Sequence, residues 1–441
     1  MIASQAPSNQ RKTFIPPPIT KIEETGLSAL WLQDLALKTL YFQGYLTGYE
    51  IAEAIALPFT AVVDKILEAL KREKLVEVKA TSIGGLGEGS YQYGITHAGM
   101  SRAREALDRS QYAGPAPVPL DVYNKTILRQ SQGQLHITRR LLRQSLSGLI
   151  LSEQVYNQVG PAVNSGSSIF IYGPPGNGKT SIARAIGKMI LKESMYIPYA
   201  LYIEGQVVKL YDSVNHELVP HSDTTKSGTG SLRTGSRRDP RWVHIQRPFI
   251  VVGGELTLSD LDLVFNPISK FYEAPFQVKS AGGILLIDDF GRQQVQPRDL
   301  LNRWIVPLEN RVDYLTLHTG RKIEVPFSVL VVFSTNLPPK DLVDEAFLRR
   351  LRHKIEIGDP SYEDYRKIFQ RVAKAKNVTY SDKGLAYLLQ EWYIKPGRSL
   401  RASHPRDICD QIIDISLFLN CEPVMSKELL NRAALAYFVE L

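Results

Sequence analysis

Apolar side chains recur every three or four positions from Leu27 to Phe42 and again from Pro58 to Leu70, a spacing that predicts amphipathic helices. Between them, Thr47-Gly48-Tyr49-Glu50 opens a short helix, because a hydroxyl three positions before an acid is a helix-start signal. Two β-type stretches, Leu75–Lys79 and Tyr91–Thr96, flank a glycine-rich tip and predict a hairpin. The pattern therefore indicates a small α+β unit.

The middle of the chain alternates between short apolar runs and helical patterns. Ile169–Tyr172, Ile284–Ile287 and Val329–Phe333 are continuous apolar runs of the kind found in strands that are buried on both faces. From Tyr362 to Leu441 the spacing becomes helical throughout. We therefore predict an α/β fold: a three-layer αβα domain with a parallel sheet, followed by a helical domain.

Composition locates the domain boundaries. Residues 1–26 are rich in Ser, Gln and Pro, and we expect a disordered tail because they cannot bury enough apolar surface to order themselves. Ala113–Pro119 alternates proline with small residues and predicts a stiff, extended linker. The predicted parts are an α+β domain at 27–112, a Pro-rich linker at 113–119, an αβα domain at 120–360 with a basic mobile insertion at 222–239, and a helical domain at 361–441.

The octapeptide Gly173-Pro174-Pro175-Gly176-Asn177-Gly178-Lys179-Thr180 lies between an apolar strand and a helical pattern that begins at Ser181. Its glycines let the backbone curl so that N–H groups converge on an anion, and the following helix adds the positive end of its dipole. We expect Lys179 to reach the β- and γ-phosphates and the Thr180 hydroxyl to coordinate Mg²⁺. Because the GxxxxGKT pattern stands between a strand and a helix, a chance glycine-rich turn is the weaker alternative.

Two later apolar strands end in polar side chains that could complete the same ATP site. Asp288 and Asp289 follow the first strand; we expect Asp288 to hold Mg²⁺ through water and Asp289 to orient the attacking water. Asn336 follows the second, and its amide can donate to a phosphate and accept from a water. Taken alone, an acidic turn after a core strand would be the safer interpretation of the two carboxylates, but downstream of GxxxxGKT it becomes the weaker one. For Asn336 the alternative is an ordinary turn Asn before Pro338.

With Asp344-Glu345-Ala346-Phe347-Leu348-Arg349-Arg350, these motifs stand in an order that resembles the AAA+ ATPases over residues 120–441. The arginine pair is similar to that of the severing and membrane-remodelling branch. The resemblance implies that Arg349 and Arg350 act on a neighbouring subunit's ATP, that Asn336 is sensor 1, and that Arg406 in His404–Asp407 reaches ATP from a helical lid. It also implies ATP and Mg²⁺ as cofactors and a homo-oligomeric ring, expected to be a hexamer.

The chain departs from the family pattern at two places. AAA+ proteins usually have Glu where Asp289 stands, and the shorter side chain predicts slow hydrolysis or a different approach to the water, because catalytic positioning tolerates little displacement. Glu255 is an additional acid without an assigned role. The segment Tyr202-Ile203-Glu204-Gly205 is only a loose match to a pore loop, which puts polypeptide threading in doubt.

The order of elements in residues 27–112 resembles a winged helix-turn-helix domain, a class that binds DNA or protein. The third helix carries Asp64, Glu68 and Glu73 beside its cations, and residues 1–130 contain 14 Lys and Arg against 13 Asp and Glu. DNA-binding domains concentrate positive charge, so the balance favours a protein-docking role over DNA binding.

Charge adds one more candidate. The chain has 53 Lys and Arg against 45 Asp and Glu, a net charge of +8 that is spread thinly and only weakly suggests a polyanionic partner. Lys226, Arg233, Arg237 and Arg238 gather in the 222–239 insertion. That insertion is either a basic finger for an acidic or phosphate-bearing partner or, more simply, a solvated loop.

The cysteine count and the lengths of the apolar runs limit which structural frameworks and compartments we expect for the chain. Two cysteines, Cys409 and Cys421, are too few for a disulfide framework or a zinc site. The sequence has no apolar run long enough to cross a membrane, and Met1–Pro18 lacks the apolar core of a signal peptide, so we expect a cytoplasmic protein.

We therefore expect an ATPase that hydrolyses ATP at subunit interfaces to remodel a protein complex whose identity the sequence does not give, with the N-terminal domain as adaptor. Two alternatives from other classes stay open. One is a DNA-acting ATPase of the initiator or transposition-helper type, which DNA would stimulate in a salt-dependent way. The other is an ATP-dependent binding switch with very slow turnover, which Asp289 suggests.

Overall fold

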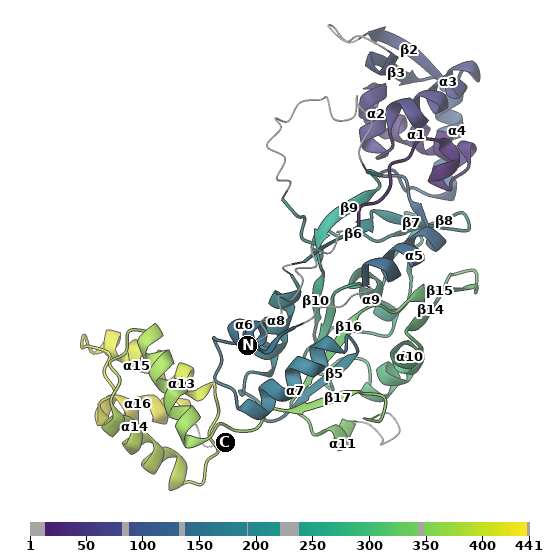
Figure 1. Ribbon diagram of the computed structural model, residues 1–441. Helices are drawn as coiled ribbons and strands as arrows, with labels where there is room; N and C mark the ends of the chain where they lie inside the picture. Colours follow the sequence, from purple (N-terminus) through teal and green to yellow (C-terminus); the bar gives the residue numbers. More distant parts are fainter. Residues whose placement is uncertain are drawn as a thin grey trace, which may run out of the picture.

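The computed structural model describes residues 14–81, 88–131, 137–191, 193–220, 238–342 and 348–438. The chain forms an α/β core around a parallel sheet, a second β layer above it, an N-terminal α+β unit beyond that layer, and a helical region at the opposite end (Figure 1). None of the helices in these ranges is both long and apolar enough to cross a membrane.

The N-terminal unit has the predicted order of elements. Its helices are held by side-chain caps: the hydroxyls of Ser28, Thr47 and Thr96 each accept a backbone N–H from the first turn of the helix that follows. A three-stranded antiparallel sheet of order β1-β3-β2 closes the unit. The winged-helix assignment stays a prediction. The elements are η1 (Ile22–Thr25), α1 (Ala29–Gln43), β1 (Leu46–Thr47), α2 (Gly48–Ala54), η2 (Phe59–Val63), α3 (Asp64–Arg72), β2 (Val76–Thr81), η3 (Glu88–Ser90), β3 (Tyr91–Ile95) and α4 (His97–Arg109).

The parallel sheet has the strand order β10-β13-β16-β5-β17, and every neighbouring pair is parallel. Side chains alternate between its faces, so Ile169 and Ile171 pack under α7 and α8 while Phe170 meets Trp304 and its neighbours on α10. The three-layer prediction for this part agrees with the structure. The bounds are β5 (Ser168–Tyr172), β10 (Phe249–Val252), β13 (Ile284–Ile287), β16 (Leu330–Thr335), β17 (His353–Glu356), α6 (Arg139–Ser145), α7 (Glu153–Asn164), α8 (Lys179–Ile190), α10 (Pro297–Asn310) and α11 (Pro339–Leu342).

A second β layer lies between the core and the N-terminal unit (Figure 1). It has a five-stranded sheet of order β11-β12-β8-β7-β4 and the antiparallel pairs β6–β9 and β14–β15. Tyr123 and Ile127 of α5 fill its core. The elements are β4 (Val118–Pro119), α5 (Leu120–Ser131), β6 (Ser194–Pro198), β7 (Ala200–Ile203), β8 (Gln206–Lys209), β9 (Trp242–Gln246), η4 (Ser259–Leu261), β11 (Val264–Asn266), β12 (Phe271–Glu273), α9 (Phe276–Lys279), β14 (Val312–Thr316) and β15 (Lys322–Pro326).

The C-terminal region is helical, as predicted, and has its own core around Tyr365, Phe369 and Ile408. Its helices form a separate lobe beside the carboxyl end of the parallel sheet (Figure 1). They are α13 (Tyr362–Ala375), α14 (Asp382–Leu389), η5 (Gln390–Ile394), α15 (His404–Phe418) and α16 (Lys427–Tyr437).

Two boundary predictions need correction. The expected disordered tail, residues 1–26, is wrong for residues 14–26: Ile19 and Thr25 are buried, and the backbone N–H of Asp239 donates to the Pro16 carbonyl. The predicted linker, 113–119, is not a free spacer: the chain bends at Gly114-Pro115, and Val118–Pro119 pairs with β7 of the second sheet. The N-terminal unit is therefore docked on the second β layer.

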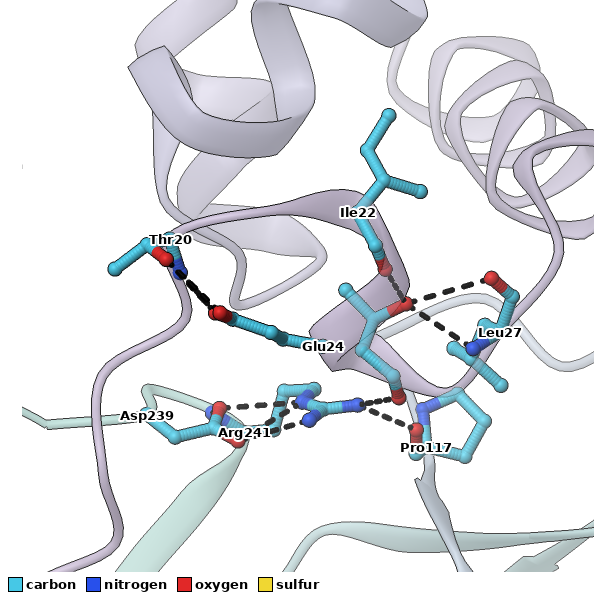
Figure 2. A network of polar contacts seen from close by, with 8 residues as sticks. Thr20, Ile22, Glu24, Leu27, Pro117, Asp239 and Arg241 are labelled. Atoms are coloured by element: carbon cyan, nitrogen blue, oxygen red, sulfur yellow. Dashed lines mark hydrogen bonds and ion pairs between the residues drawn. The ribbon is translucent and has the colours of Figure 1, made fainter.

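A buried ion pair fastens this joint. Arg241 and Asp239 are only 2% and 4% exposed. The Arg241 guanidinium donates to the Asp239 carboxylate at 2.9 Å and to the main-chain carbonyls of Thr25 at 2.7 Å and Pro117 at 3.1 Å (Figure 2). One side chain thus ties the segment before α1, the linker and β9 together, and it satisfies carbonyls that would otherwise be buried without donors.

Replacing Arg241 with Met should therefore destabilise the protein by about 3 to 5 kcal/mol, because the Asp239 carboxylate stays buried without its partner. Chemical denaturation measures the loss, and protease cleavage within residues 14–26 should become faster. The double variant Asp239→Asn, Arg241→Met should recover part of that stability. Arg321→Ala, which removes the exposed ion pair with Glu204, is the control and should cost less than about 1 kcal/mol. A loss for Arg241→Met no larger than that control would contradict this account of the joint.

Candidate nucleotide site

The octapeptide 173–180, called the phosphate loop below, connects the buried strand β5 to helix α8 at the carboxyl edge of the parallel sheet. Gly173 has φ +140°, and a Cβ there would lie 2.3 Å from the Ile357 carbonyl oxygen. Gly176 has φ +80°, and a Cβ there would lie 2.5 Å from the Ser403 hydroxyl. Both glycines are required by backbone conformation and by close approach, so the loop keeps its curl.

Lys179, the first residue of α8, is 6% exposed. Its ammonium donates to the main-chain carbonyls of Gly173 and Pro174, both at 2.9 Å, and to the Asn336 side-chain oxygen at 2.6 Å. Burial lowers the pKa of the Lys179 ammonium, and the nearby carboxylates of Asp289 and Asp288 oppose that shift. The amine is thus held in place at the mouth of the loop.

Asn336 reaches this amine because of the order of the strands. β16 lies between β5 and β13, so the residue that follows it stands between the phosphate loop and the acidic pair that follows β13. Its side-chain nitrogen lies 3.3 Å from an Asp289 carboxylate oxygen. Asn336 therefore contacts Lys179 on one side and Asp289 on the other.

Asp288 and Thr180 form the other contact between the two halves. The Thr180 hydroxyl donates to an Asp288 carboxylate oxygen at 3.0 Å. Among the residues described, no group of three or more His, Cys, Asp or Glu side chains could hold a metal ion. Two hard oxygen atoms at a phosphate loop nevertheless fit Mg²⁺, which keeps several waters and binds few protein ligands when phosphates supply the others.

Asp289 has φ +49°, an uncommon conformation for a non-glycine residue. The strain turns the chain sharply after β13, and the carboxylate lines the same cavity as the phosphate loop. The other acid noted in the sequence, Glu255, is exposed. Its carboxylate accepts the Gly253 N–H at 2.9 Å, which lowers its pKa, and so it closes its own turn.

A cavity of about 600 Å³ opens over the phosphate loop, within the size range of small-molecule sites. Its lining is polar where it meets residues 175–181, Asp289 and Asn336. Away from the loop it becomes apolar, between the segment before α7 and helix α13. The apolar lining residues are Leu149, Ile150, Leu151, Ile368, Val372 and Ala375. The cavity thus offers a charged end for phosphates and an apolar end for a flat ring.

The helical region supplies cations to this cavity. Arg406 lines it from the first turn of α15, while its guanidinium lies 3.1 Å from the neighbouring carboxylate of Asp407. Arg371 and Lys376, which sequence reasoning missed, line it from α13 and the residue after it. Helical spacing could have shown that Arg371 shares a face with Ile368, but not that this face meets the phosphate loop.

Arg349 and Arg350 lie elsewhere. They line a second cavity, of about 730 Å³, with Arg311, Arg352 and residues 165 and 167, which precede β5. The Arg350 guanidinium pairs with Glu309 at 2.5 Å. This cavity is at the amino end of β5 and the phosphate loop is at its carboxyl end, about 16 Å away for five residues at ~3.3 Å each. Both arginines are therefore too far to reach a nucleotide in the same chain.

Three further sequence candidates have different outcomes. The pore-loop candidate is wrong as a free loop: Tyr202 is in β7 with its ring 5.6 Å from that of Trp31, and Glu204 and Gly205 form a tight turn to β8. Lys226, Arg233 and Arg237 lie outside the described residues, as do Asp344–Phe347. Arg238 is described, and its guanidinium donates to the Tyr196 hydroxyl at 3.2 Å.

Comparison with known proteins adds little to this geometry. A family model described as a domain of unknown function, DUF8689, matches residues 361–435. No curated protein matches the chain. Solved structures with a similar course of the chain are NtrX from Brucella abortus in complex with ADP (16% identity, TM-score 0.39, 76% of this chain and 65% of that one) and the Thermotoga maritima RuvB Holliday junction branch migration motor (14%, 0.34, 70% and 74%). The chain spans slightly less than two thirds of NtrX. Likenesses this weak carry no functional argument, which therefore rests on the site itself.

Proposed function

We propose that this protein is an AAA+ ATPase that binds ATP with Mg²⁺ at residues 173–181 and hydrolyses it to ADP and phosphate. The observation that carries the proposal is the convergence of Lys179, Asn336 and Asp289 at one end of a nucleotide-sized cavity. Asn336 and Asp289 follow two different strands and Lys179 begins α8. Residues with purely structural roles would not need to meet at a glycine-rich anion-binding loop.

The residues divide the work of phosphoryl transfer. The N–H groups of the phosphate loop and the Lys179 ammonium bind the β- and γ-phosphates. Thr180 and Asp288 would hold Mg²⁺, which neutralises charge on the phosphate oxygens when bound. Asn336 contacts the γ-phosphate, and Asp289 accepts a hydrogen bond from the attacking water, which aligns its oxygen with the phosphorus. Arg406 contributes positive charge from the helical lid.

The distant arginines support an oligomer. A guanidinium that serves hydrolysis must lie beside the γ-phosphate, and Arg349 and Arg350 line a cavity at the opposite edge of the sheet. A neighbouring copy that presents its amino edge to this chain's phosphate loop would bring them into place. We propose a closed ring of identical subunits, a hexamer, because head-to-tail contacts of this kind repeat until the rotation closes.

The charges on the N-terminal unit suit a protein-docking role in such a ring. Its third helix carries charges of both signs, and Arg102 of α4 is already paired with Asp34 at 3.0 Å and Glu73 at 2.8 Å. This surface does not concentrate positive charge as a DNA-binding face does. We propose that the unit binds a protein client, which nucleotide-driven movement of the ring then remodels. Hydrolysis stimulated severalfold by duplex DNA, with a steep loss in salt, would instead assign the chain to DNA.

Replacing Asp289 with Asn should slow ATP turnover by about 100-fold or more while ATP binding is retained, because a neutral amide oxygen polarises the water less than a carboxylate does, but the phosphate contacts remain. Steady-state phosphate release and nucleotide titration measure the two effects. Glu255→Gln is the matched control, since that acid is nearby but does not line the cavity. Equal turnover in Asp289→Asn and the wild type would reject the catalytic role, and would favour a binding switch if both rates are negligible.

Subunit mixing tests the arginines. The Lys179→Ala protein and the double variant Arg349→Ala, Arg350→Ala should each lose about 10³-fold or more in turnover, and an equimolar mixture should regain part of it. Recovery is expected because an intact phosphate loop of one subunit meets intact arginines of the other. Arg432→Ala, an exposed cation of α16, is the control for mixing and should stay fully active. Mixed oligomers that form without any recovery would contradict service between subunits.

A further inference from the structure

Asn177 occupies a variable position of the phosphate loop, yet its side chain is only 5% exposed. The amide nitrogen donates to the Gly358 carbonyl at 3.1 Å and to an Asp359 carboxylate oxygen at 2.8 Å. The amide oxygen accepts the backbone N–H of Ala402 at 3.0 Å. Both ends of the amide are therefore used by residues outside the phosphate loop: the segment through which the chain enters the helical region, and the segment just before α15 within that region.

The segment that Asn177 holds is in direct contact with the loop. Ser403 lies so close to Gly176 that a Cβ there would not fit, and Arg401 pairs with the same Asp359 carboxylate. A Cβ at Gly176 would also lie 3.6 Å from the Arg401 Cβ, so Arg401 stands beside the phosphate loop. Helix α15 begins at His404 and carries Arg406 into the cavity two residues later.

A carboxamide suits this position because two acceptors and one donor face it at once. Serine and threonine have a single hydroxyl hydrogen, and an aspartate would add a second carboxylate beside Asp359. Asp359, before the helical region, and Ala402, before α15, are 43 positions apart in sequence but meet at one side chain. A displacement of Asn177 would therefore act on both segments at once.

We propose that Asn177 is a positioning residue that couples the phosphate loop to the helical lid and sets the place of Arg401 and Arg406 over a bound nucleotide. The inference rests on the nucleotide site proposed above, and it names the contact by which occupancy of that site moves the lid. Asn177 acts through the lid and has no part in the chemical step.

The test uses the full-length protein with a fluorescent ATP analogue and a dye on Cys421. Cys421 is exposed in the lid, whereas Cys409 is buried, which raises its pKa to about 12 and keeps it unreactive at neutral pH. In the wild type, nucleotide should change the anisotropy of the dye. Asn177→Ala should raise both the Kd for the analogue and the KM for ATP about tenfold, change kcat less than about threefold, and abolish the anisotropy response, because the lid arginines lose their placement.

Two further variants separate positioning from a general effect on folding. Asn177→Asp should bind nucleotide more weakly than Asn177→Ala, since two carboxylates then face one another. Adding Asp359→Asn to Asn177→Asp should restore the affinity to within about threefold of the wild-type value. Asn164→Ala is the matched control, because Asn164 also bridges two backbone groups, those of Ile137, within the α/β core. It should lower the melting temperature but leave KM and the lid response unchanged.

The outcomes are distinguishable. If the wild type binds no more analogue than Lys179→Ala, the proposed nucleotide site itself is wrong. If the wild type binds and Asn177→Ala keeps the wild-type KM and lid response, only the coupling role is overturned. Failure of the Asp359→Asn exchange to improve Asn177→Asp would also overturn it, since a direct interaction between the two side chains predicts recovery.

Discussion

The hydrogen bond from the Lys179 ammonium to the Asn336 side chain, at 2.6 Å, joins the phosphate loop to the proposed catalytic apparatus, beside the contact between Thr180 and Asp288. It depends on the insertion of β16 between β5 and β13 in the parallel sheet. If β5 paired directly with β13, the acidic residues would adjoin the loop and no amide would stand between them. The strand order therefore places the Asn336 amide between Lys179 and Asp289.

The arrangement of the domains would let ATP hydrolysis at the proposed site act on the distant N-terminal unit. The cavity over residues 175–181 is lined by both the α/β core and the C-terminal helical region, while the N-terminal unit lies at the far end beyond the second β layer (Figure 1). Because Arg241 fastens that unit to β9 and to the linker, a client held there would not be on a flexible tether (Figure 2). Movement of the core relative to a neighbouring subunit would reach the client through packed structure.

Local signals explain what could be predicted. Glycines, a lysine and a threonine at fixed spacing indicate an anion loop because the chemistry is contained in eight consecutive residues. Strand ends such as Asp288 and Asn336 could be found because apolar runs of four or five residues precede them. Helix caps, including Thr47 with Glu50, are equally local, and the observed helices begin where they indicate.

The failures of prediction have a common cause in contacts between distant segments. Residues 14–26 have a composition typical of a tail, but Ile19 packs in the core of the N-terminal unit and the Thr25 carbonyl accepts a hydrogen bond from Arg241. Tyr202 belongs to the segment that loosely matches a pore loop, yet its ring packs against that of Trp31, 171 positions earlier. From the sequence, Asn177 is only a spacer in the phosphate loop; its contact with the backbone N–H of Ala402 is seen only in the folded structure. Such pairings cannot be read from periodicity or spacing.

The most direct test of the account is calorimetric titration of the full-length protein with ATP and Mg²⁺, in parallel with Lys179→Met. The account predicts one ATP per chain for the wild type and an affinity at least about 100-fold weaker for the variant, because the methionine has no charge with which to bind the phosphates. Equal affinities for the two proteins, or no heat of binding for the wild type over the micromolar to millimolar range, would contradict it.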